Sequence, residues 1–402
     1  MLEQTPFLLV AGIMLCLFFI VGYACRRLRL PSVLAFIIIG ILLSTLMNGD
    51  GKTLHTVAEI GIVLLFFLLG LEFPLRRMME ISKRVWPAGL LDIVLNLGVG
   101  LLIALIFGLS FAMALLIGAV VYASSSSITL KMLEEKKRLA SPEAEFILAL
   151  LIFEDLVAPI LVSFLAGLHS GGDVTTQSLV ILFAKILLIT AGAILIGYFG
   201  FRKLGEFMEK HMETDLMPLL AVGIALGYAG LAMALGLSEV LGAFLAGVML
   251  SETGRSKELD HLILPVRDIT LPFFFFWFGT TITFGQGIPM AGLLVALVLW
   301  SIAGKVLVGF YGGRMYGLSP RASLRAGLSL VQRGEFSAII AALAAPAWRT
   351  FSGIYILFTA LVGLLMFNKA PKWSKWANER FFKTPPPPKT GDPSTVPVNR
   401  AS

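Results

Sequence analysis

Long apolar runs separated by short polar stretches fill this sequence from residue 7 to about residue 370. A helix of about 20 residues crosses a bilayer, and most runs are close to that length. The short alternating segments that a soluble sheet would need are absent from the sequence. The pattern therefore predicts an all-α polytopic membrane protein with about thirteen transmembrane helices. The predicted spans are residues 7–25, 31–47, 55–73, 85–109, 111–131, 144–168, 177–200, 216–235, 237–252, 266–284, 288–313, 320–344 and 350–368.

Composition and charge support a membrane protein in a lipid bilayer. Of the 402 residues, 57% are hydrophobic and 14% are charged, whereas about a quarter are charged in soluble proteins. The formal net charge of +7 would suit a nucleic-acid partner, but the basic residues gather in alternate loops, as the positive-inside rule describes. We therefore expect no nucleic-acid partner. The loop charges place the N-terminus outside and the C-terminus in the cytoplasm, in a bacterial inner membrane.

The pattern divides the chain into one membrane domain, residues 1–370, and a tail, residues 371–402. The tail contains four consecutive prolines, Pro385 to Pro388, and has no apolar periodicity. Such a segment lacks the apolar surface that folding requires. The sequence therefore predicts a disordered cytoplasmic tail.

An internal repeat relates the two ends of the membrane domain. Val33-Leu34, Gly40 and Ser44 recur 207 positions later, and Phe66-Phe67 falls on Phe273-Phe274 at the same offset. The second and ninth spans are an odd number of crossings apart, so the two copies enter the membrane in opposite senses. Inverted repeats of this kind, here about residues 31–168 and 238–369, are typical of secondary transporters.

Two adjacent acids, Glu154 and Asp155, lie near the middle of the sixth predicted span. An acid at this depth costs about 2.5–3.5 kcal/mol on insertion scales, so it indicates a functional site by default. Neighbouring helical residues point in different directions. One carboxylate is therefore expected to face a cavity while the other meets a partner helix.

Two polar segments at corresponding positions of the repeats predict broken helices. Ser124 to Ser127 interrupt the fifth span, and adding the offset leads to the segment from Val331 to Gly334 in the twelfth. Paired breaks mark the binding site of many transporters. The charges of Arg333 and Glu335 would either compensate the ends of the half-helices or pair with each other. The expected crossing residues are Ser124, Ser127, Gln332, Arg333, Gly334 and Glu335, with Ser125 and Ser126 beside a bound cation.

Lys305 lies inside the eleventh span, where a lysine needs a carboxylate or a route to the surface. We expect an ion pair with Glu154 or Asp155. Asp92 and Asn96 are one helical turn apart, and we interpret them as inter-helix hydrogen-bonding residues. The two cysteines and four histidines have no metal-ligand spacing, so we expect no cofactor and no metal beyond a transient alkali ion.

Taken together, Gly70-Leu71-Glu72, the serine run, Phe153-Glu154-Asp155 and Arg333-Gly334-Glu335-Phe336 resemble the Kef-type branch of the monovalent cation:proton antiporters. The resemblance implies a sodium/proton antiporter-like fold with inverted repeats and two crossed broken helices. It implies exchange of potassium or sodium for protons by an elevator-like movement, with the essential aspartate at Asp155. It also implies a homodimer and, since this chain has no nucleotide-binding domain after residue 370, a separate soluble regulatory subunit.

The function expected is potassium efflux coupled to proton uptake, with Asp155, Glu154 and Lys305 as the working residues. Sodium:proton antiport at the same site is the first alternative. A cation-coupled organic anion symporter would need a larger cavity, and a channel would show no coupling to a proton gradient. An intramembrane aspartyl protease would need Asp92 and Asp155 to meet over one water molecule.

Overall fold

The computed structural model describes residues 7–28, 31–44, 51–72, 85–170, 176–201, 210, 216–282 and 290–381. In these ranges helices are the only regular elements, which confirms the predicted fold class. They are α1 (Phe7–Leu28), α2 (Ser32–Leu43), α3 (Gly51–Leu71), the π-helix η2 (Ile93–Gly98), α5 (Val99–Ile106), α6 (Phe111–Tyr122), α7 (Ser126–Glu135), α8 (Pro142–Ser170), α9 (Thr176–Ile196), the π-helix η3 (Gly197–Phe201), α11 (Met217–Ala234), α12 (Glu239–Ser251), α13 (Ser256–Thr280), α14 (Ala291–Met315), α15 (Pro320–Leu328), α16 (Glu335–Ala342) and α17 (Pro346–Phe381).

Ten helical segments in the described ranges are long and apolar enough to cross a membrane, counting 85–106 and 111–135 as one segment each. The helices α2 and α12 are shorter apolar helices. The pair α15 and α16 is interrupted in the middle. The number thirteen is reached only if all three of these elements also cross, and it stays a prediction.

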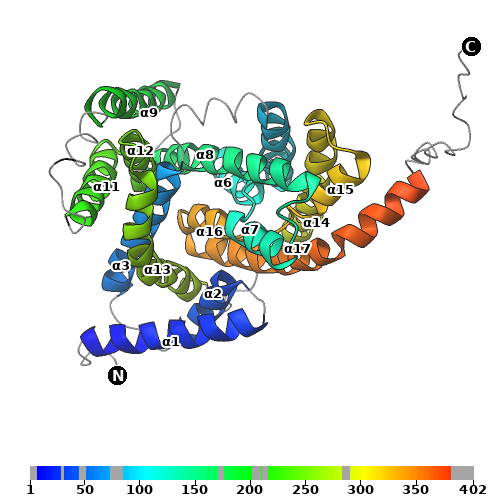
Figure 1. Ribbon diagram of the computed structural model, residues 1–402, viewed down its shortest axis with the longest axis horizontal. Coiled ribbons are helices and arrows are strands. Elements are labelled where there is room, and N and C mark those ends of the chain that lie inside the picture. The colour runs from blue at the N-terminus through cyan, green and yellow to red at the C-terminus, as the bar shows by residue number, and fades with distance from the viewer. Residues whose placement is uncertain are drawn as a thin grey trace, which may run out of the picture.

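The helices form two groups that lie side by side in Figure 1. We call residues 85–170 and 291–381 the core half, since they contain α5 to α8 and α14 to α17. Residues 32–72 and 217–282, with α2, α3 and α11 to α13, form the scaffold half, and α1 packs against α2. Each half thus combines a segment from the first part of the chain with one from the second, as the predicted repeats require.

Two reciprocal glycine contacts hold the scaffold half together. A Cβ atom on Gly40 would lie 2.1 Å from the carbonyl oxygen of Phe276, and one on Gly279 would lie 2.2 Å from that of Ile37. The α2 and α13 backbones therefore touch, as small residues allow in membrane helices.

The second contact, between α3 and α12, has the same form. A Cβ atom on Gly70 would lie 2.1 Å from the carbonyl oxygen of Phe244, and one on Gly247 would lie 2.1 Å from that of Phe67. In both contacts each glycine meets the carbonyl three residues before its partner. This symmetry supports the repeat that the sequence predicts.

The contacts also correct the alignment of the second repeat helix. Gly40 corresponds to Gly247 at the predicted offset of 207, but Gly70 corresponds to Gly279, an offset of 209. Phe67 therefore matches Phe276 rather than Phe274. Four consecutive phenylalanines, Phe273 to Phe276, make the two alignments indistinguishable in sequence. All four are buried, so they serve in packing and not in lipid contact.

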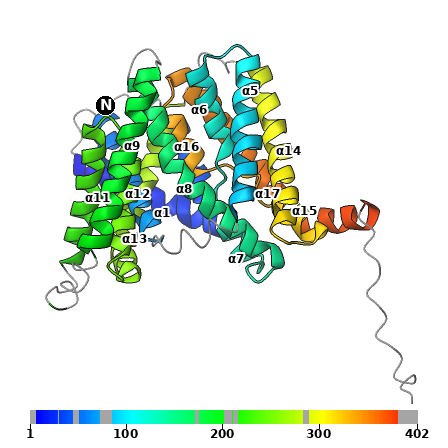
Figure 2. The same cartoon turned by 90° about the horizontal axis from the view of Figure 1, so that it is seen from above.

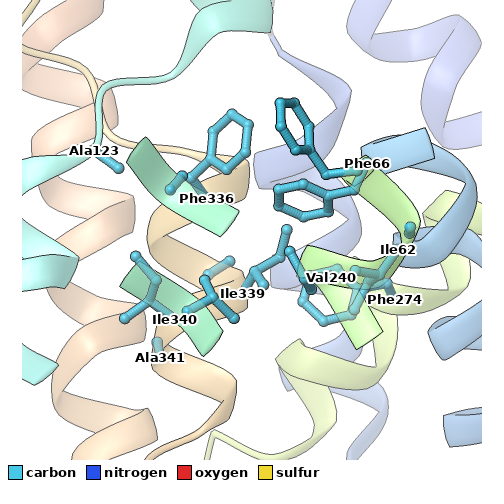
Figure 3. Close-up of a cluster of buried hydrophobic side chains, with 14 of the residues drawn as sticks. Ile62, Phe66, Ala123, Val240, Phe274, Phe336, Ile339, Ile340 and Ala341 are labelled. Carbon is cyan, nitrogen blue, oxygen red and sulfur yellow. The ribbon is translucent and has the colours of Figure 1, made fainter. Parts of the chain in front are cut away.

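The boundary between the halves is apolar (Figure 3). Figure 3 shows Phe336 and Ile339 of the core half facing Phe66 and Val240 of the scaffold half. The rings of Phe66 and Phe336 meet edge to face, with centroids 5.4 Å apart. Apolar packing is joined by a polar contact, because the Ser238 N–H of the scaffold half donates to the Ser163 hydroxyl of α8 at 3.3 Å.

The C-terminal helix is longer than predicted. The disordered tail was expected from residue 371, but α17 continues through Pro371 to Phe381, so this boundary was wrong. The segment is charged and aromatic rather than uniformly apolar, which is why the apolar pattern ends before the helix does. Residues 382–402, including the four prolines, lie outside the described residues.

Candidate functional site

Both predicted breaks are present, and they meet. The chain leaves helical geometry between α6 and α7 at residues 123–125, and between α15 and α16 at residues 329–334. The backbone N–H of Ser125 donates to the carbonyl of Gln332 at 3.0 Å. These two residues are 207 positions apart, which is the repeat offset. The crossing point of the broken helices therefore lies where the two repeats correspond.

Hydroxyl side chains at each break donate hydrogen bonds to backbone carbonyls at the other break. The hydroxyl of Ser337 donates to the carbonyls of Val120 and Ala123 at the end of α6, at 2.8 and 3.1 Å. The hydroxyl of Ser124 donates to the carbonyl of Leu330 at 3.2 Å. Helix ends leave such groups without intrahelical partners, and water is scarce at this depth. The serine run is therefore a capping device as well as a break.

Glu335 and Arg333 compensate helix ends rather than each other. The Glu335 carboxylate accepts from the Ser125 hydroxyl at 2.6 Å and from the Ser127 N–H at 3.0 Å, at the positive end of α7. The Arg333 guanidinium donates to the carbonyls of Leu330 and Val331, just after α15. Of the two alternatives left open by the sequence, the described geometry supports compensation of the half-helices.

Gly334 is required by close approach. A Cβ atom there would lie 2.4 Å from the hydroxyl oxygen of Ser125. Any larger residue would separate the two breaks at the point where Glu335 reaches across. The Gln332 side chain adds a link, because its amide donates to the Thr129 hydroxyl at 2.5 Å.

Asp155 lies on α8 beside the crossing. Its two carboxylate oxygens accept from the Ser126 hydroxyl at 2.8 and 3.0 Å. Asp155 is 5% exposed, while Ser126 is half-buried and Ser127 is exposed. A carboxylate beside a hydroxyl offers only oxygen ligands, which suit a proton or a hard monovalent cation. The two cannot occupy the same carboxylate well at the same time.

Glu154 points elsewhere, as the helical geometry predicted. Its carboxylate accepts from the Ser124 N–H at 2.6 Å and lies 3.0 Å from the Lys305 ammonium. The expected ion pair of Lys305 therefore forms with Glu154 rather than with Asp155. Lys305 is fully buried on α14, so it does not reach the surface.

Asp92 was missed as the second partner of Lys305. Both of its oxygens lie 2.8 Å from the Lys305 ammonium, and it also accepts from the Asn96 amide at 2.6 Å. The interpretation of Asp92 as a simple hydrogen-bonding residue was thus incomplete. The signal was available, because Asp92 is the only acid within the fourth predicted span and a buried lysine needs an acid. Pairing with a distant helix could not be read from sequence.

A second buried ion cluster was also missed. Glu143, at the start of α8, accepts from Arg138 at 2.8 Å and also pairs with Arg325 of α15. Arg138 in turn donates to the Ser329 hydroxyl at 3.1 Å. Burial lowers the pKa of the Arg138 guanidinium, and its hydrogen bond to Glu143 opposes that shift. The cluster fixes α8 to α15 within the core half.

Two cavities separate the core half from helices of the other group. One, of about 770 Å³, has Ile152 of α8 on one side and Glu72, Ser251 and Arg255 on the other. The second, of about 630 Å³, lies between Lys131 and Glu134 of α7 and residues of α1, α2 and α13. Both contain residues next to loops predicted to be cytoplasmic. Ile152 lies three residues before Asp155 on α8, so the first cavity comes within about one helical turn of Asp155.

Comparison with known proteins agrees with this architecture. Residues 13–373 match the family model described as sodium/hydrogen exchanger, transmembrane. The ammonium/H⁺ antiporter subunit AmhT of Alkalihalophilus pseudofirmus is 52% identical over 366 residues, covering 91% of this chain and 94% of that protein. The K⁺/H⁺ antiporter subunit KhtU of Bacillus subtilis is 33% identical, covering 80% of this chain and 81% of its own length.

The fold agrees as well. The solved structure of the sodium proton antiporter MjNhaP1 from Methanocaldococcus jannaschii superimposes with a TM-score of 0.68 over 91% of this chain, at 18% identity. Kef-type potassium-efflux proteins match at lower identity than AmhT and KhtU, which confirms the resemblance inferred from the motifs. This chain therefore belongs to the transmembrane sodium/hydrogen exchanger family, and it is a cation:proton antiporter, a secondary transporter rather than an enzyme.

Proposed function

We propose that this chain exchanges potassium and ammonium ions for protons at Asp155, across a bacterial inner membrane. The observation that carries the proposal is the Asp155 carboxylate, held 2.8 and 3.0 Å from the Ser126 hydroxyl beside two crossed broken helices. A proton and a cation compete for this carboxylate. Loading one expels the other, which is the requirement for coupled exchange.

The choice of cation is supported by chemistry and by similarity. The carboxylate of Asp155 and the lone pairs of the Ser126 hydroxyl are acceptors, so they suit a bare alkali ion and also the N–H donors of ammonium. The relative at 52% identity is an ammonium/H⁺ antiporter subunit, and the one at 33% is a K⁺/H⁺ antiporter subunit. Potassium and ammonium are similar in size, so one site serves both. Sodium at the same site is the alternative.

Lys305 keeps the neighbouring acids in place in this proposal. The ammonium group of the Lys305 side chain lies between the carboxylates of Asp92 and Glu154. Glu154 is also tied to the Ser124 backbone at the crossing. Glu154 therefore links the charge cluster to the broken helices, next to the residue that exchanges its ligand. We take the cavity lined by Ile152, about one helical turn from Asp155 on α8, as the route from the predicted cytoplasmic face.

Two partners complete the proposal. The relatives AmhT and KhtU are named as antiporter subunits, which supports a separate soluble regulatory subunit for this chain. A homodimer in the bilayer is expected from the family resemblance alone. A chemical cross-link between two copies in native membranes would test it.

The test uses the purified chain in liposomes that contain a pH dye, with the membrane voltage clamped. Potassium, ammonium or sodium is added outside, and the wild type is compared with Asp155→Asn. We expect potassium and ammonium to drive proton movement and the variant to abolish it. The variant vesicles also report the passive movement of ammonia, so the ammonium signal is taken as the difference.

Each other outcome contradicts a part of the proposal. Proton movement driven by sodium alone would reject the proposed substrates but keep the site. Normal exchange by a folded Asp155→Asn protein would reject the site. No exchange with any of the three cations would contradict exchange by this chain alone, and adding a purified soluble subunit would then test its requirement.

A further inference from the structure

The end of α17 leaves the helix bundle. Pro371 lies inside α17, and a proline in a helix removes a hydrogen bond and bends the helix. In Figure 2 the red end of α17 turns away from the bundle and lies across the direction of α5 and α14. We call residues 371–381 the α17 extension. Its direction is that of a helix lying along a membrane surface rather than through it.

The extension has an exposed aromatic surface. Trp373 is 47% exposed, Trp376 is 57% exposed and Phe381 is 66% exposed. Ala370 and Ser374, by contrast, are fully buried, so one side of the helix is fixed against the protein. The tryptophan surface therefore faces away from the bundle.

Basic side chains accompany the aromatic ones. Lys372, Lys375 and Arg380 outnumber the single acid, Glu379. The Arg380 guanidinium lies 5.9 Å from the centre of the Trp376 ring, so a cation accompanies the aromatic surface. Lys375 lies 3.9 Å from Glu379, but both side chains are more than half exposed, so this pair does not remove the lysine from solvent.

We propose that the α17 extension is an interfacial helix that binds anionic phospholipid headgroups. Tryptophan is enriched where hydrocarbon meets headgroups, and lysine and arginine are enriched on the cytoplasmic side. Helices that combine exposed aromatic and basic side chains lie in that interface and attract anionic lipids. The extension also continues directly from a span, which places it at the membrane surface. The position of the extension therefore favours lipid over a soluble protein as its partner.

The first experiment locates the extension. A fluorescent label is attached at Trp376→Cys in a chain in which Cys16 and Cys25 are serine, and the control label is at Glu134→Cys, an exposed site on α7. The labelled chain is placed in vesicles of phosphatidylcholine and phosphatidylglycerol. We expect quenching of the first label, and not of the second, by lipids that carry a quencher at the headgroup boundary. Equal accessibility of both labels to an aqueous quencher would overturn the proposal and indicate docking of a soluble protein.

The second experiment tests the lipid charge. Thermal stability in detergent is measured as phosphatidylglycerol or phosphatidylcholine is added, for the wild type and for Lys372→Gln/Lys375→Gln/Arg380→Gln. The matched control is Lys136→Gln/Lys137→Gln/Lys257→Gln, which removes the same charge from exposed positions elsewhere. We expect the first variant to lose about tenfold or more in apparent affinity for phosphatidylglycerol, with the control unchanged. An equal loss of affinity in both variants would show that the binding depends only on the total charge of the protein. That result would overturn a specific lipid site at the extension.

The fold of each variant is verified by its elution as a single peak in size-exclusion chromatography in detergent and by its melting temperature without added lipid. None of the substituted lysines or arginines touches the crossing. The proposal therefore stands or fails independently of which cation the protein exchanges.

Discussion

The two halves of the molecule bury different kinds of surface. Every buried charged side chain in the described part of the chain lies in the core half: Asp92, Arg138, Glu143, Glu154, Asp155, Lys305, Arg333 and Glu335. The buried polar residues of the scaffold half, over the same described ranges, are Ser238 and Ser251. Buried charge is costly in a membrane and is kept where it has a function. The comparison supports our proposal that ion exchange takes place in the core half, with the scaffold half as its support.

Both halves solve the same geometrical problem in different ways. Each repeat contributes helices that must cross helices of the other repeat. In the scaffold half the helices cross at glycines, so that unbroken backbones touch. In the core half they cross at unwound segments, and the freed backbone groups are paired by Ser124, Ser337 and Glu335. Only the second solution leaves polar atoms available to a substrate, because only there is the helical hydrogen bonding interrupted.

The largest expected effect comes from removing an acid from one half or the other. Asp155→Asn should abolish cation-driven proton movement in liposomes, because the amide cannot alternate between proton and cation. Glu239→Gln, at the start of α12 in the scaffold half, should leave the exchange rate near that of the wild type. Equal loss in both variants would remove the functional distinction between the halves.

The next effect concerns the charges around Lys305. Lys305→Met leaves Asp92 and Glu154 without a counter-ion, and breaking a buried pair costs about 3–5 kcal/mol. We expect a large fall in melting temperature in detergent, with much of it recovered in Asp92→Asn/Lys305→Met. A double variant no more stable than Lys305→Met would show that Asp92 carries no charge that Lys305 must balance.

A smaller effect is expected at the glycine crossings. Gly247→Ala would place a Cβ atom 2.1 Å from the carbonyl oxygen of Phe67, and such overpacking costs about 1–3 kcal/mol. The matched control is Gly227→Ala in α11, where a Cβ atom would meet nothing within 4 Å. The control should be as stable as the wild type or slightly more stable in the same melting experiment. Equal stability of the two variants would contradict close contact between α3 and α12.

The last effect concerns a single hydroxyl and bears on cation affinity rather than on stability. Ser126→Ala removes the hydrogen bond to Asp155, which is worth about 1.5–3 kcal/mol when the acceptor is charged. We expect the apparent KM for potassium to rise by about tenfold or more, with the maximal rate less affected. Ser301→Ala is the control, since that hydroxyl donates to the carbonyl of Val298 in its own helix and is no partner of Asp155 among the described hydrogen bonds. A KM unchanged by Ser126→Ala would separate this hydroxyl from the cation.

The sequence by itself determined the membrane fold, the repeat and the two broken segments. Apolar length and repeat offset are local or periodic properties, and runs such as Ser124 to Ser127 conflict with helix formation wherever they occur. The acids Glu154 and Asp155 were recognisable for the same reason, since a charge within an apolar run stands out without any knowledge of its neighbours.

Only the tertiary structure decided how these elements meet. Lys305 forms ion pairs with Glu154 and Asp92 rather than with Asp155, because α8, α14 and the segment before α5 pack at one point. The sequence could not separate two adjacent carboxylates, nor show that Phe67 aligns with Phe276 within a run of phenylalanines. It also ended the membrane domain at residue 370, because the α17 extension changes in composition without ceasing to be helical. Partner choice and helix direction depend on packing between distant segments, and a linear pattern does not contain that information.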